Sequence, residues 1–213
     1  MSSIPVVVFG AGGLGREVMR TVLLTLASNE EYPALGYVDD GVAVGTIRNG
    51  FPVLGGYDYL ENFDGDIALV FGIGNSDTKA GLYHKFKDNR NISFPNVIHP
   101  GASVDEYASL GRGVVIGLGC SISVDVVIGN CVFMNSCTLV GHDSKIGDFT
   151  SIMSLAAISG NVTIGERCLI GVHSAIKQGL SVGDAAVVGM GSVVLRNVPA
   201  GATVLGNPAR RIR

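Results

Sequence analysis

A medium-sized apolar residue recurs at every sixth position in the second half of the chain, without one exception. The series is Ile98, Val104, Leu110, Ile116, Ile122, Ile128, Met134, Val140, Ile146, Ile152, Ile158, Ile164, Ile170, Ile176, Val182, Val188 and Val194. A period of six matches neither the 3.6-residue turn of a helix nor the two-residue alternation of a strand. It is typical of a hexapeptide β-helix, in which short flat strands wind into a prism.

The neighbouring columns of the repeat agree with a prism. Small residues stand two positions before the apolar one, because a narrow interior admits little besides one large side chain per strand. Glycine often follows the apolar residue, and we expect it to supply either a positive φ or a missing side chain at the corners. Three strands per turn make a coil of eighteen residues, so residues eighteen apart stack. One such ladder of small residues comprises Cys120, Thr138, Ala156, Ser174 and Ser192.

The first 95 residues lack the period of six and alternate between strand-like and helix-like segments. Such alternation predicts a small Rossmann-like α/β domain around a parallel sheet. The sequence therefore predicts two domains, an α/β domain of residues 1–95 and a β-helix domain of residues 96–213. The expected strands are Val6–Phe9, Ala34–Val38, Phe51–Leu54 and Asp66–Phe71, and the expected helices are Arg16–Ala27 and Thr78–Asn89.

A glycine-rich turn, Gly10–Gly15, lies between the first expected strand and the first expected helix. Backbone N–H groups at a helix N-terminus attract anions, and glycine lets a phosphate approach the backbone. Asp39, at the end of the next strand, can accept hydrogen bonds from a ribose or a base edge. The domain is too short for the second half of a dinucleotide site, so we expect a single nucleotide or a nucleotide-sugar rather than NAD. A tight turn without a ligand is the alternative.

Four histidines occur in the chain, and three of them have structural explanations. His84 is expected on the solvated face of the second helix. His99 lies in the junction between the two domains, where a capping or linking role fits. His173 is expected to point outward from the middle of a strand.

His142 differs because an acid, Asp143, follows it directly. A neutral imidazole accepts a proton from an attacking amine or hydroxyl, and a carboxylate fixes its tautomer. Neighbouring side chains on a flat strand point to opposite sides, so Asp143 reaches the imidazole only at a bent corner. The preceding Gly141 favours such a corner. A polar corner at a subunit interface is the alternative interpretation.

Two further residues are candidates for the same site. Gly160 follows His142 by eighteen residues, one coil away at the same corner, and its N–H could donate to a developing oxyanion. Asn135 precedes His142 by seven residues and could offer its amide to a sugar hydroxyl.

The net charge of −3 argues against a surface that binds nucleic acid. No apolar stretch is long enough for membrane insertion, and no secretory leader is visible at the N-terminus, so a cytoplasmic location is expected. The four cysteines form no CxxC pair and are expected to be small buried residues rather than metal or redox groups.

The combination of these features resembles the hexapeptide-repeat sugar acyltransferases. It is similar to the NeuD/PglD-type group, which contains bacterial UDP-4-amino-sugar N-acetyltransferases and sialic acid O-acetyltransferases. The resemblance extends over essentially the whole chain. It is carried by Gly10-Ala11-Gly12-Gly13, Asp39-Asp40, Gly72-Ile73-Gly74-Asn75, the hexads with Asn135 and His142-Asp143, and Val204-Leu205-Gly206-Asn207-Pro208-Ala209.

The resemblance implies a left-handed β-helix, a homotrimer, and acetyl-CoA as co-substrate in the cleft between two prisms, with no metal. It implies that His142 acts as general base with support from Asp143, and that Gly160 approaches the thioester carbonyl. It places the nucleotide part of the substrate near Gly12, Gly13, Asp39 and Asp40, and the sugar near Asn135.

The chain departs from the resembling family at two positions. Many members have a histidine in the glycine-rich turn where this chain has Leu14. Some have a second histidine where this chain has Ser151, so Ser151 is expected to take part in cofactor contacts.

The leading hypothesis is direct N-acetylation of a nucleotide-linked amino sugar by acetyl-CoA. O-acetylation of a sugar such as a sialic acid would use the same base, so the sequence leaves this alternative open. A non-catalytic nucleotide-sugar-binding scaffold is a second alternative. A zinc hydratase built on the same prism would need three converging histidines, and His99, His142 and His173 include no close pair.

Overall fold

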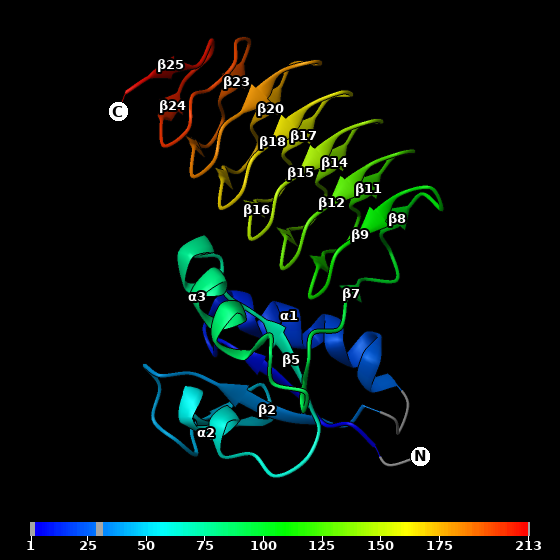
Figure 1. Cartoon of the computed structure of the whole chain (residues 1–213), viewed down its shortest axis with the longest axis vertical. Helices are drawn as coiled ribbons and strands as arrows, with labels where there is room; N and C mark the ends of the chain where they lie inside the picture. The colour runs from blue at the N-terminus through cyan, green and yellow to red at the C-terminus, as the bar shows by residue number, and fades with distance from the viewer. Residues whose placement is uncertain (1–2, 29–31, 213) are drawn as a thin grey trace.

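The hexads form a parallel β-helix with three flat faces, which stands on a smaller α/β domain (Figure 1). The structure is a computed structural model that describes residues 3–28 and 32–212. We number the faces in the order in which the chain meets them. Face 1 comprises β7 (Val97–Ile98), β10 (Val115–Ile116), β13 (Phe133–Met134), β16 (Ser151–Ile152), β19 (Leu169–Ile170), β22 (Val187–Val188) and β24 (Thr203–Leu205), with β25 (Arg210–Arg211) added antiparallel.

The other two faces follow face 1 in every coil. Face 2 comprises β8 (Ser103–Val104), β11 (Ser121–Ile122), β14 (Leu139–Val140), β17 (Ala157–Ile158), β20 (Ala175–Ile176) and β23 (Val193–Val194). Face 3 comprises β9 (Ser109–Leu110), β12 (Val127–Ile128), β15 (Lys145–Ile146), β18 (Thr163–Ile164) and β21 (Ser181–Val182).

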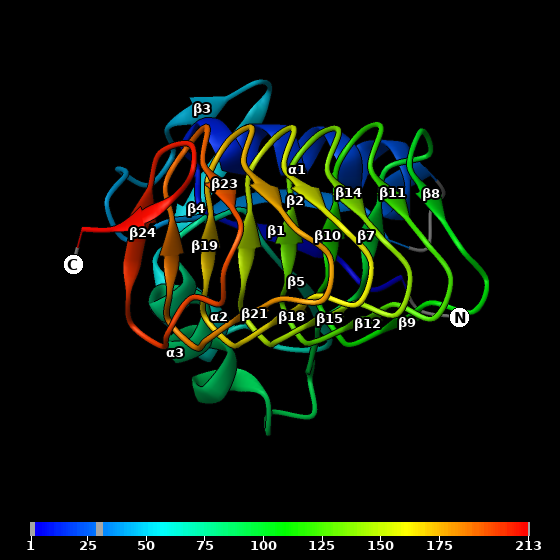
Figure 2. The same ribbon diagram turned by 90° about the horizontal axis from the view of Figure 1, so that it is seen from above.

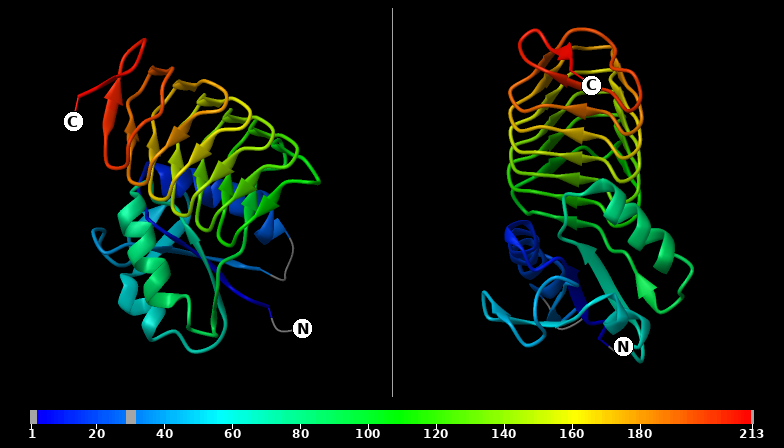
Figure 3. Two further views of the ribbon diagram at one scale, coloured as in Figure 1. Left: turned by 45° about the horizontal axis from the view of Figure 1, so that its top comes forward. Right: turned by 90° about the vertical axis from the view of Figure 1, so that its left-hand side faces the viewer.

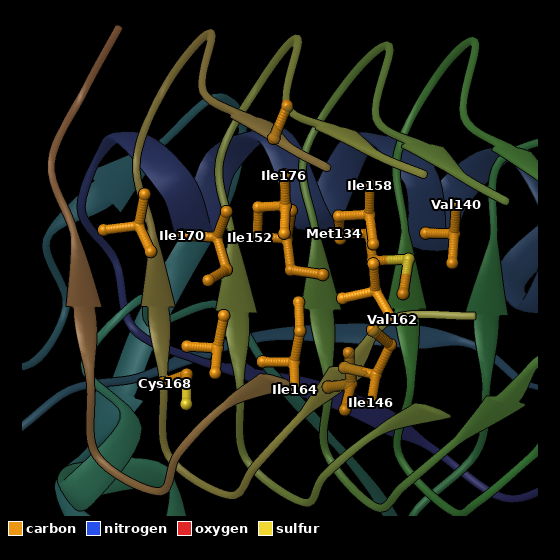
Figure 4. Packing of buried hydrophobic residues seen from close by; sticks show 14 of the residues in the cluster. Met134, Val140, Ile146, Ile152, Ile158, Val162, Ile164, Cys168, Ile170 and Ile176 are labelled. Carbon is orange, nitrogen blue, oxygen red and sulfur yellow. The ribbon is translucent and has the colours of Figure 1, made fainter. Parts of the chain in front are cut away.

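The predicted coil of eighteen residues is confirmed by the strand register. Ile122 pairs with Val140, and Val140 pairs in turn with Ile158. The apolar residues from Ile116 to Val194 at every sixth position are all buried and point into the prism, as Figure 4 shows for part of the cluster. The predicted ladder of small residues from Cys120 to Ser192 is buried beside them. Burial of this continuous apolar interior is what holds the coils together.

The glycines that directly follow the apolar residues do not supply the positive φ of the corners. Positive φ occurs three residues after the apolar position, for example at Asp125 and Asp143, whereas Gly141 has none. A Cβ at Gly141 would instead lie 2.5 Å from the amide nitrogen of Gly160 in the next coil. These glycines are therefore needed because the missing side chain lets successive coils approach closely.

The α/β domain has a six-stranded sheet with the order β3-β4-β2-β1-β5-β6. The strands are β1 (Val6–Phe9), β2 (Ala34–Val38), β3 (Ile47–Arg48), β4 (Phe51–Gly55), β5 (Ile67–Phe71) and β6 (Ile92–Ser93). The helices are α1 (Gly13–Leu24), α2 (Tyr57–Glu61) and α3 (Ser76–Phe86), with a short 3-10 turn η1 (Leu26–Ser28). All pairs are parallel except β3 with β4.

The expected strands and helices of this domain are present, but both helices begin earlier than the apolar spacing indicates. The helix expected at Thr78 begins at Ser76, because the side chain of Asn75 accepts a hydrogen bond from the Thr78 amide and caps the first turn. The helix expected to reach Ala27 ends at Leu24 and continues as the 3-10 turn. Strands β3 and β6 and the short α2 were not predicted.

The α/β domain packs against face 1 of the prism, with α1 running beneath it (Figure 2). Val97, Val115 and Phe133 of face 1 share one apolar cluster with Val18 and Val22 of α1. The C-terminal coils lie farthest from the α/β domain (Figure 3). None of the helices in the described part of the chain is long and apolar enough to cross a membrane.

Candidate functional site

His142 and Asp143 lie together on the edge where face 2 turns into face 3. Asp143 has φ +58°, and this left-handed residue bends the chain so that the two neighbouring side chains meet. Nδ1 of His142 lies 2.7 Å from Oδ2 of Asp143, and both side chains are about half exposed. The bent corner that the sequence analysis required is therefore present.

The other ring nitrogen of His142 faces Gly160. A Cβ placed on Gly160 would lie 2.5 Å from Nε2 and 2.7 Å from Cε1 of the imidazole, so a side chain larger than hydrogen does not fit there without moving the ring. Because Asp143 accepts a hydrogen bond from Nδ1–H, the neutral ring keeps its lone pair on Nε2. The geometry thus presents a basic nitrogen directly beside a bare stretch of backbone.

The N–H of Gly160 is an open donor beside that nitrogen. On the edge between faces 3 and 1, side chains from the next coil cap the equivalent N–H groups. Oδ1 of Asn130 accepts from the Arg112 amide at 3.0 Å, and Oδ1 of Asp184 accepts from the Glu166 amide at 2.9 Å. In the described part of the chain, nothing accepts the Gly160 N–H. A donor of this kind can stabilise negative charge on a substrate oxygen.

The same edge carries an arginine farther up the prism. Arg196 occupies the same position after β23 that His142 occupies after β14. The two residues are three coils apart, which corresponds to about 14 Å at the usual spacing of neighbouring strands. Arg196, Arg210 and Arg211 line a cavity at the C-terminal end of the prism. A basic nitrogen and a cationic pocket therefore lie on one edge, with Gly160 and Gln178 in the coils between them.

A second group of candidates lies at the carboxyl edge of the α/β sheet. The strand order reverses direction between β1 and β5, and open α/β sheets bind ligands in the crevice at this point. The glycine-rich turn and the loop Gly72–Asn75 flank this crevice. They pack closely, since a Cβ at Gly72 would lie 2.6 Å from Cα of Gly15, and the Gly72 amide donates to the carbonyl of Phe9 just before the turn at 2.8 Å.

The glycines of the turn divide into two kinds. A Cβ at Gly10 would lie 2.8 Å from the Gly72 carbonyl oxygen, so Gly10 permits close packing of the two loops. Gly12 and Gly13 are exposed, and a Cβ at either would meet nothing within 4 Å. The N-cap residue of α1 is Gly12, which brings no side chain to cap the first turn. The first amides of this helix are therefore open to an anion.

Asp39 and Asp40 hold the loops of this edge. Oδ2 of Asp39 accepts the Ala11 amide at 2.7 Å, and its Oδ1 accepts the Gly41 amide at 2.8 Å. Oδ1 of Asp40 accepts the Tyr57 amide at 2.9 Å. Asp39 thus fixes the glycine-rich turn against the end of β2, a role that the sequence did not reveal.

Asn135 lies in an apolar pocket between α1 and the edge that joins faces 1 and 2. The pocket also includes Leu14, Val18, Leu118 and Phe133, and His99 is at its wall. Oδ1 of Asn135 accepts the Ser136 amide at 2.7 Å.

Nδ1 of His99 accepts the Gly101 amide at 2.9 Å, which confirms the expected capping role in the interdomain junction.

The structure brings His142, Asp143 and Gly160 together but separates them from the other candidates. Face 1 packs on the α/β domain, and the edge between faces 2 and 3 is the one opposite face 1. The glycine-rich turn, Asp39, Asp40 and Asn135 therefore lie on the other side of the same chain. Sequence reasoning missed this separation, because the repeat alone does not say which face the first domain covers.

The expected cofactor role of Ser151 is corrected by its position. Ser151 is fully buried on face 1 against α3. Its Oγ accepts a hydrogen bond from Nζ of Lys79 at 2.8 Å and donates to the Gly74 carbonyl at 2.8 Å. It joins the two domains and has no surface to offer a cofactor.

The remaining histidines and cysteines add no second site. His173 is exposed, but it is a corner residue with φ +56° rather than the mid-strand residue expected. His84 is exposed as expected, and its ring contacts Phe149. Cys120, Cys131 and Cys168 are buried as expected, whereas Cys137 is an exposed corner residue with φ +60°, because its side chain points outward from the bend. Within residues 3–28 and 32–212, no three histidine, cysteine, aspartate or glutamate side chains converge as metal ligands do.

Comparison with known families agrees with this two-part architecture. Residues 5–86 match the PglD N-terminal domain, residues 143–178 match the bacterial transferase hexapeptide of six repeats, and residues 161–196 match the hexapeptide repeat of succinyl-transferase. The comparison with curated protein sequences produced no match.

Several solved structures share the whole fold with this chain. WeeI from Acinetobacter baumannii is 32% identical with a TM-score of 0.89, and the alignment covers 99% of this chain and 100% of that chain. The acetyltransferase domain of PglB from Neisseria gonorrhoeae is 30% identical with a TM-score of 0.90, covering 98% and 99%. It has also been solved with acetyl coenzyme A. A mutant of perosamine N-acetyltransferase from Caulobacter crescentus, solved with CoA and GDP-perosamine, is 29% identical with a TM-score of 0.88, covering 98% and 97%.

Proposed function

The chain belongs to the PglD-type family of hexapeptide-repeat acetyltransferases, and from that premise we propose that it acetylates the amino group of a nucleotide-linked amino sugar with acetyl-CoA. The observation that carries the proposal is the contact of His142 with both Asp143 and Gly160. In this proposal residues 1–95 bind the nucleotide part of the substrate, and residues 96–213 perform the transfer. The cytoplasm is the proposed location.

The proposed chemistry is a direct transfer without a covalent enzyme intermediate. The amine nitrogen attacks the thioester carbonyl while Nε2 of His142 accepts a proton from that nitrogen. The Gly160 N–H donates to the oxyanion of the tetrahedral intermediate. The C–S bond then breaks, the proton passes from His142 to the leaving sulfur, and an amide and free CoA result. Asp143 stabilises the imidazolium that forms in between.

The proposed site is completed by a second copy of the chain, in the homotrimer expected for this family. The α/β domain cannot reach the His142 edge of its own prism, because it covers face 1. Exposed apolar side chains follow the edge between faces 1 and 2, namely Leu118, Leu155, Val172 and Met190, and Leu139 is exposed on face 2. An apolar strip of this kind favours packing against another prism. That packing would bring the His142 edge of one chain next to the α/β domain of its neighbour.

We propose that acetyl-CoA lies along the His142 edge with its phosphates at the C-terminal arginine pocket. The thioester would lie at Gly160, and the extended pantetheine arm would pass Gln178 toward Arg196. The length of about 14 Å between His142 and Arg196 suits such an arm. Arginine is well suited to phosphate because its guanidinium donates several hydrogen bonds in a fixed plane.

Replacing Arg196 with alanine is expected to raise KM for acetyl-CoA about tenfold, with kcat changed less than about twofold. The phosphates are bound equally in the ground state and the transition state, and losing about 1.4 kcal/mol of that binding raises KM tenfold without lowering kcat. Steady-state kinetics with acetyl-CoA measure both constants. With acetyl-pantetheine, which lacks the phosphates, the variant and the wild type should have equal KM. Arg167→Ala, an exposed arginine on a different edge, is the matched control. An unchanged KM for acetyl-CoA would contradict the proposed orientation.

The function itself is tested by thiol release from acetyl-CoA in the presence of UDP-, dTDP-, GDP- and CMP-linked sugars, each with and without an amino group. We expect turnover only with amino sugars on one or two of the nucleotides. The product should survive mild alkali, because an amide resists it whereas an ester does not. An alkali-labile product would indicate O-acetylation. Binding of a nucleotide-sugar without thiol release would indicate a scaffold.

A further inference from the structure

A buried lysine joins the two domains next to the nucleotide crevice. Lys79, on α3, is 1% exposed. Its Nζ donates to the Cys131 carbonyl at 3.1 Å and to Oγ of Ser151 at 2.8 Å. Oγ of Ser151 donates in turn to the Gly74 carbonyl at 2.8 Å. A continuous hydrogen-bond chain therefore runs from the Cys131 carbonyl of the prism, through Lys79 of α3 and Ser151 of β16, to the loop Gly72–Asn75.

Charge pairing does not explain this lysine. Within residues 3–28 and 32–212 no carboxylate pairs with Lys79. The nearby Cys131 offers no counter-charge, because burial raises the pKa of its thiol to about 12. Burial also lowers the pKa of Lys79 to about 7, which shows how strongly the site disfavours a charged amine. An apolar side chain would fill the same space at a lower desolvation cost. What the amine supplies is the pair of directed hydrogen bonds.

The loop at the end of this chain forms one wall of the proposed nucleotide crevice. Gly72 packs against the glycine-rich turn, and a Cβ at Gly74 would lie 3.6 Å from Leu14 and 3.5 Å from Met153 of the prism. Asn75 caps α3, the helix that carries Lys79, by accepting from the Thr78 amide at 2.9 Å. The position of the loop is therefore set from both of its ends, by Phe9 through Gly72 and by the prism through Gly74.

We propose that Lys79 and Ser151 are positioning residues, which hold the loop Gly72–Asn75 in the conformation that receives the nucleotide part of the substrate. The kinetic consequence rests on the proposed function, whereas the conformational consequence does not. Neither residue touches the substrate. Both act through the backbone of the loop, so they should affect binding of the nucleotide-sugar and leave the acetyl-CoA edge unaffected.

Two variants test this proposal, Lys79→Met and Ser151→Ala. Lys79→Met removes the two hydrogen bonds that Nζ donates, and Ser151→Ala removes the two bonds that Oγ makes, so both variants lose the bond between the two residues. We expect KM for the nucleotide-linked sugar to rise about tenfold, with KM for acetyl-CoA and kcat changed less than about twofold. The double variant should be no worse than Ser151→Ala alone, because Lys79 acts on the loop through Ser151, whose Oγ makes the bond of this chain that reaches Gly74. Lys85→Met, on the exposed side of the same helix, is the matched control.

Amide hydrogen exchange of the unliganded proteins provides a readout that needs no substrate. Peptides covering residues 72–78 should exchange at least severalfold faster in both variants than in the wild type and in Lys85→Met, while peptides around His142 stay unchanged. If turnover fails for every substrate, this exchange result still decides the proposal. Unchanged exchange at residues 72–78 would overturn it. Equal increases in both KM values would also overturn it, because they would indicate a general loss of structure.

Discussion

His142→Ala is expected to lower kcat by a factor of about 10²–10⁴, the usual contribution of a positioned general base. In the proposed mechanism the attacking amine must lose a proton as the C–N bond forms, and Nε2 of His142, which lies beside Gly160, is the base that accepts it. KM for both substrates should change little, since the imidazole acts on the transition state rather than on the bound ground state.

The measurement is the rate of thiol release at saturating substrates, together with a thermal unfolding curve. The variant should unfold like the wild type, because His142 is half exposed and supports no core contact. His84→Ala, another exposed histidine, is the control and should retain full turnover. Wild-type kcat in His142→Ala would remove His142 from the mechanism.

Gly160→Ala is expected to lower kcat by about 10²-fold, because a displacement of the catalytic group by about 1 Å can cost that much. The added Cβ would lie 2.5 Å from Nε2 of His142, so the imidazole must rotate or shift away. Either movement weakens the 2.7 Å contact with Asp143 and moves the base away from the Gly160 N–H. The backbone itself tolerates alanine, since Gly160 does not have a positive φ.

Kinetics of single and double variants distinguish displacement of the His142 ring from a general loss of structure. In the His142→Ala background, adding Gly160→Ala should lower kcat little further, because the ring that it displaces is already absent. Gly81→Ala on α3, where a Cβ meets nothing within 4 Å, is the matched control and should retain full turnover. Undiminished turnover in Gly160→Ala would show that the imidazole adapts to the methyl group without loss of function.

Much of the prism and part of the site could be predicted because a repeat makes its contacts at a constant separation. The stacking of Gly160 on His142 follows from the count of eighteen residues, and the strand pairs have that separation. The meeting of His142 and Asp143 required only a bent corner, which the structure has at Asp143. Contacts of this kind are local or periodic, so the residue types at fixed offsets are sufficient to infer them.

Contacts between distant segments could not be inferred in this way. Lys79 and Ser151 are 72 positions apart, and nothing in either local pattern indicates that they meet. Ser151 occupies an outward position on a strand like many others, so its burial depends on the α/β domain, whose Lys79 and Gly74 both contact its hydroxyl. For the same reason, the cofactor role that the family resemblance implied for Ser151 is excluded by the burial of its side chain. Asp39 likewise holds the Ala11 amide 28 residues away.

The sequence by itself determined the coil, the buried columns and the corner that carries His142, Asp143 and Gly160. Each of these follows from side-chain size and chain stereochemistry repeated at a fixed interval, and the burial of one apolar residue per strand enforces the interval. Only the tertiary structure decided that the α/β domain covers face 1, that Lys79 links it to the prism, and that the His142 edge is the one opposite face 1. These depend on how two non-periodic surfaces fit together, which no interval along the chain encodes.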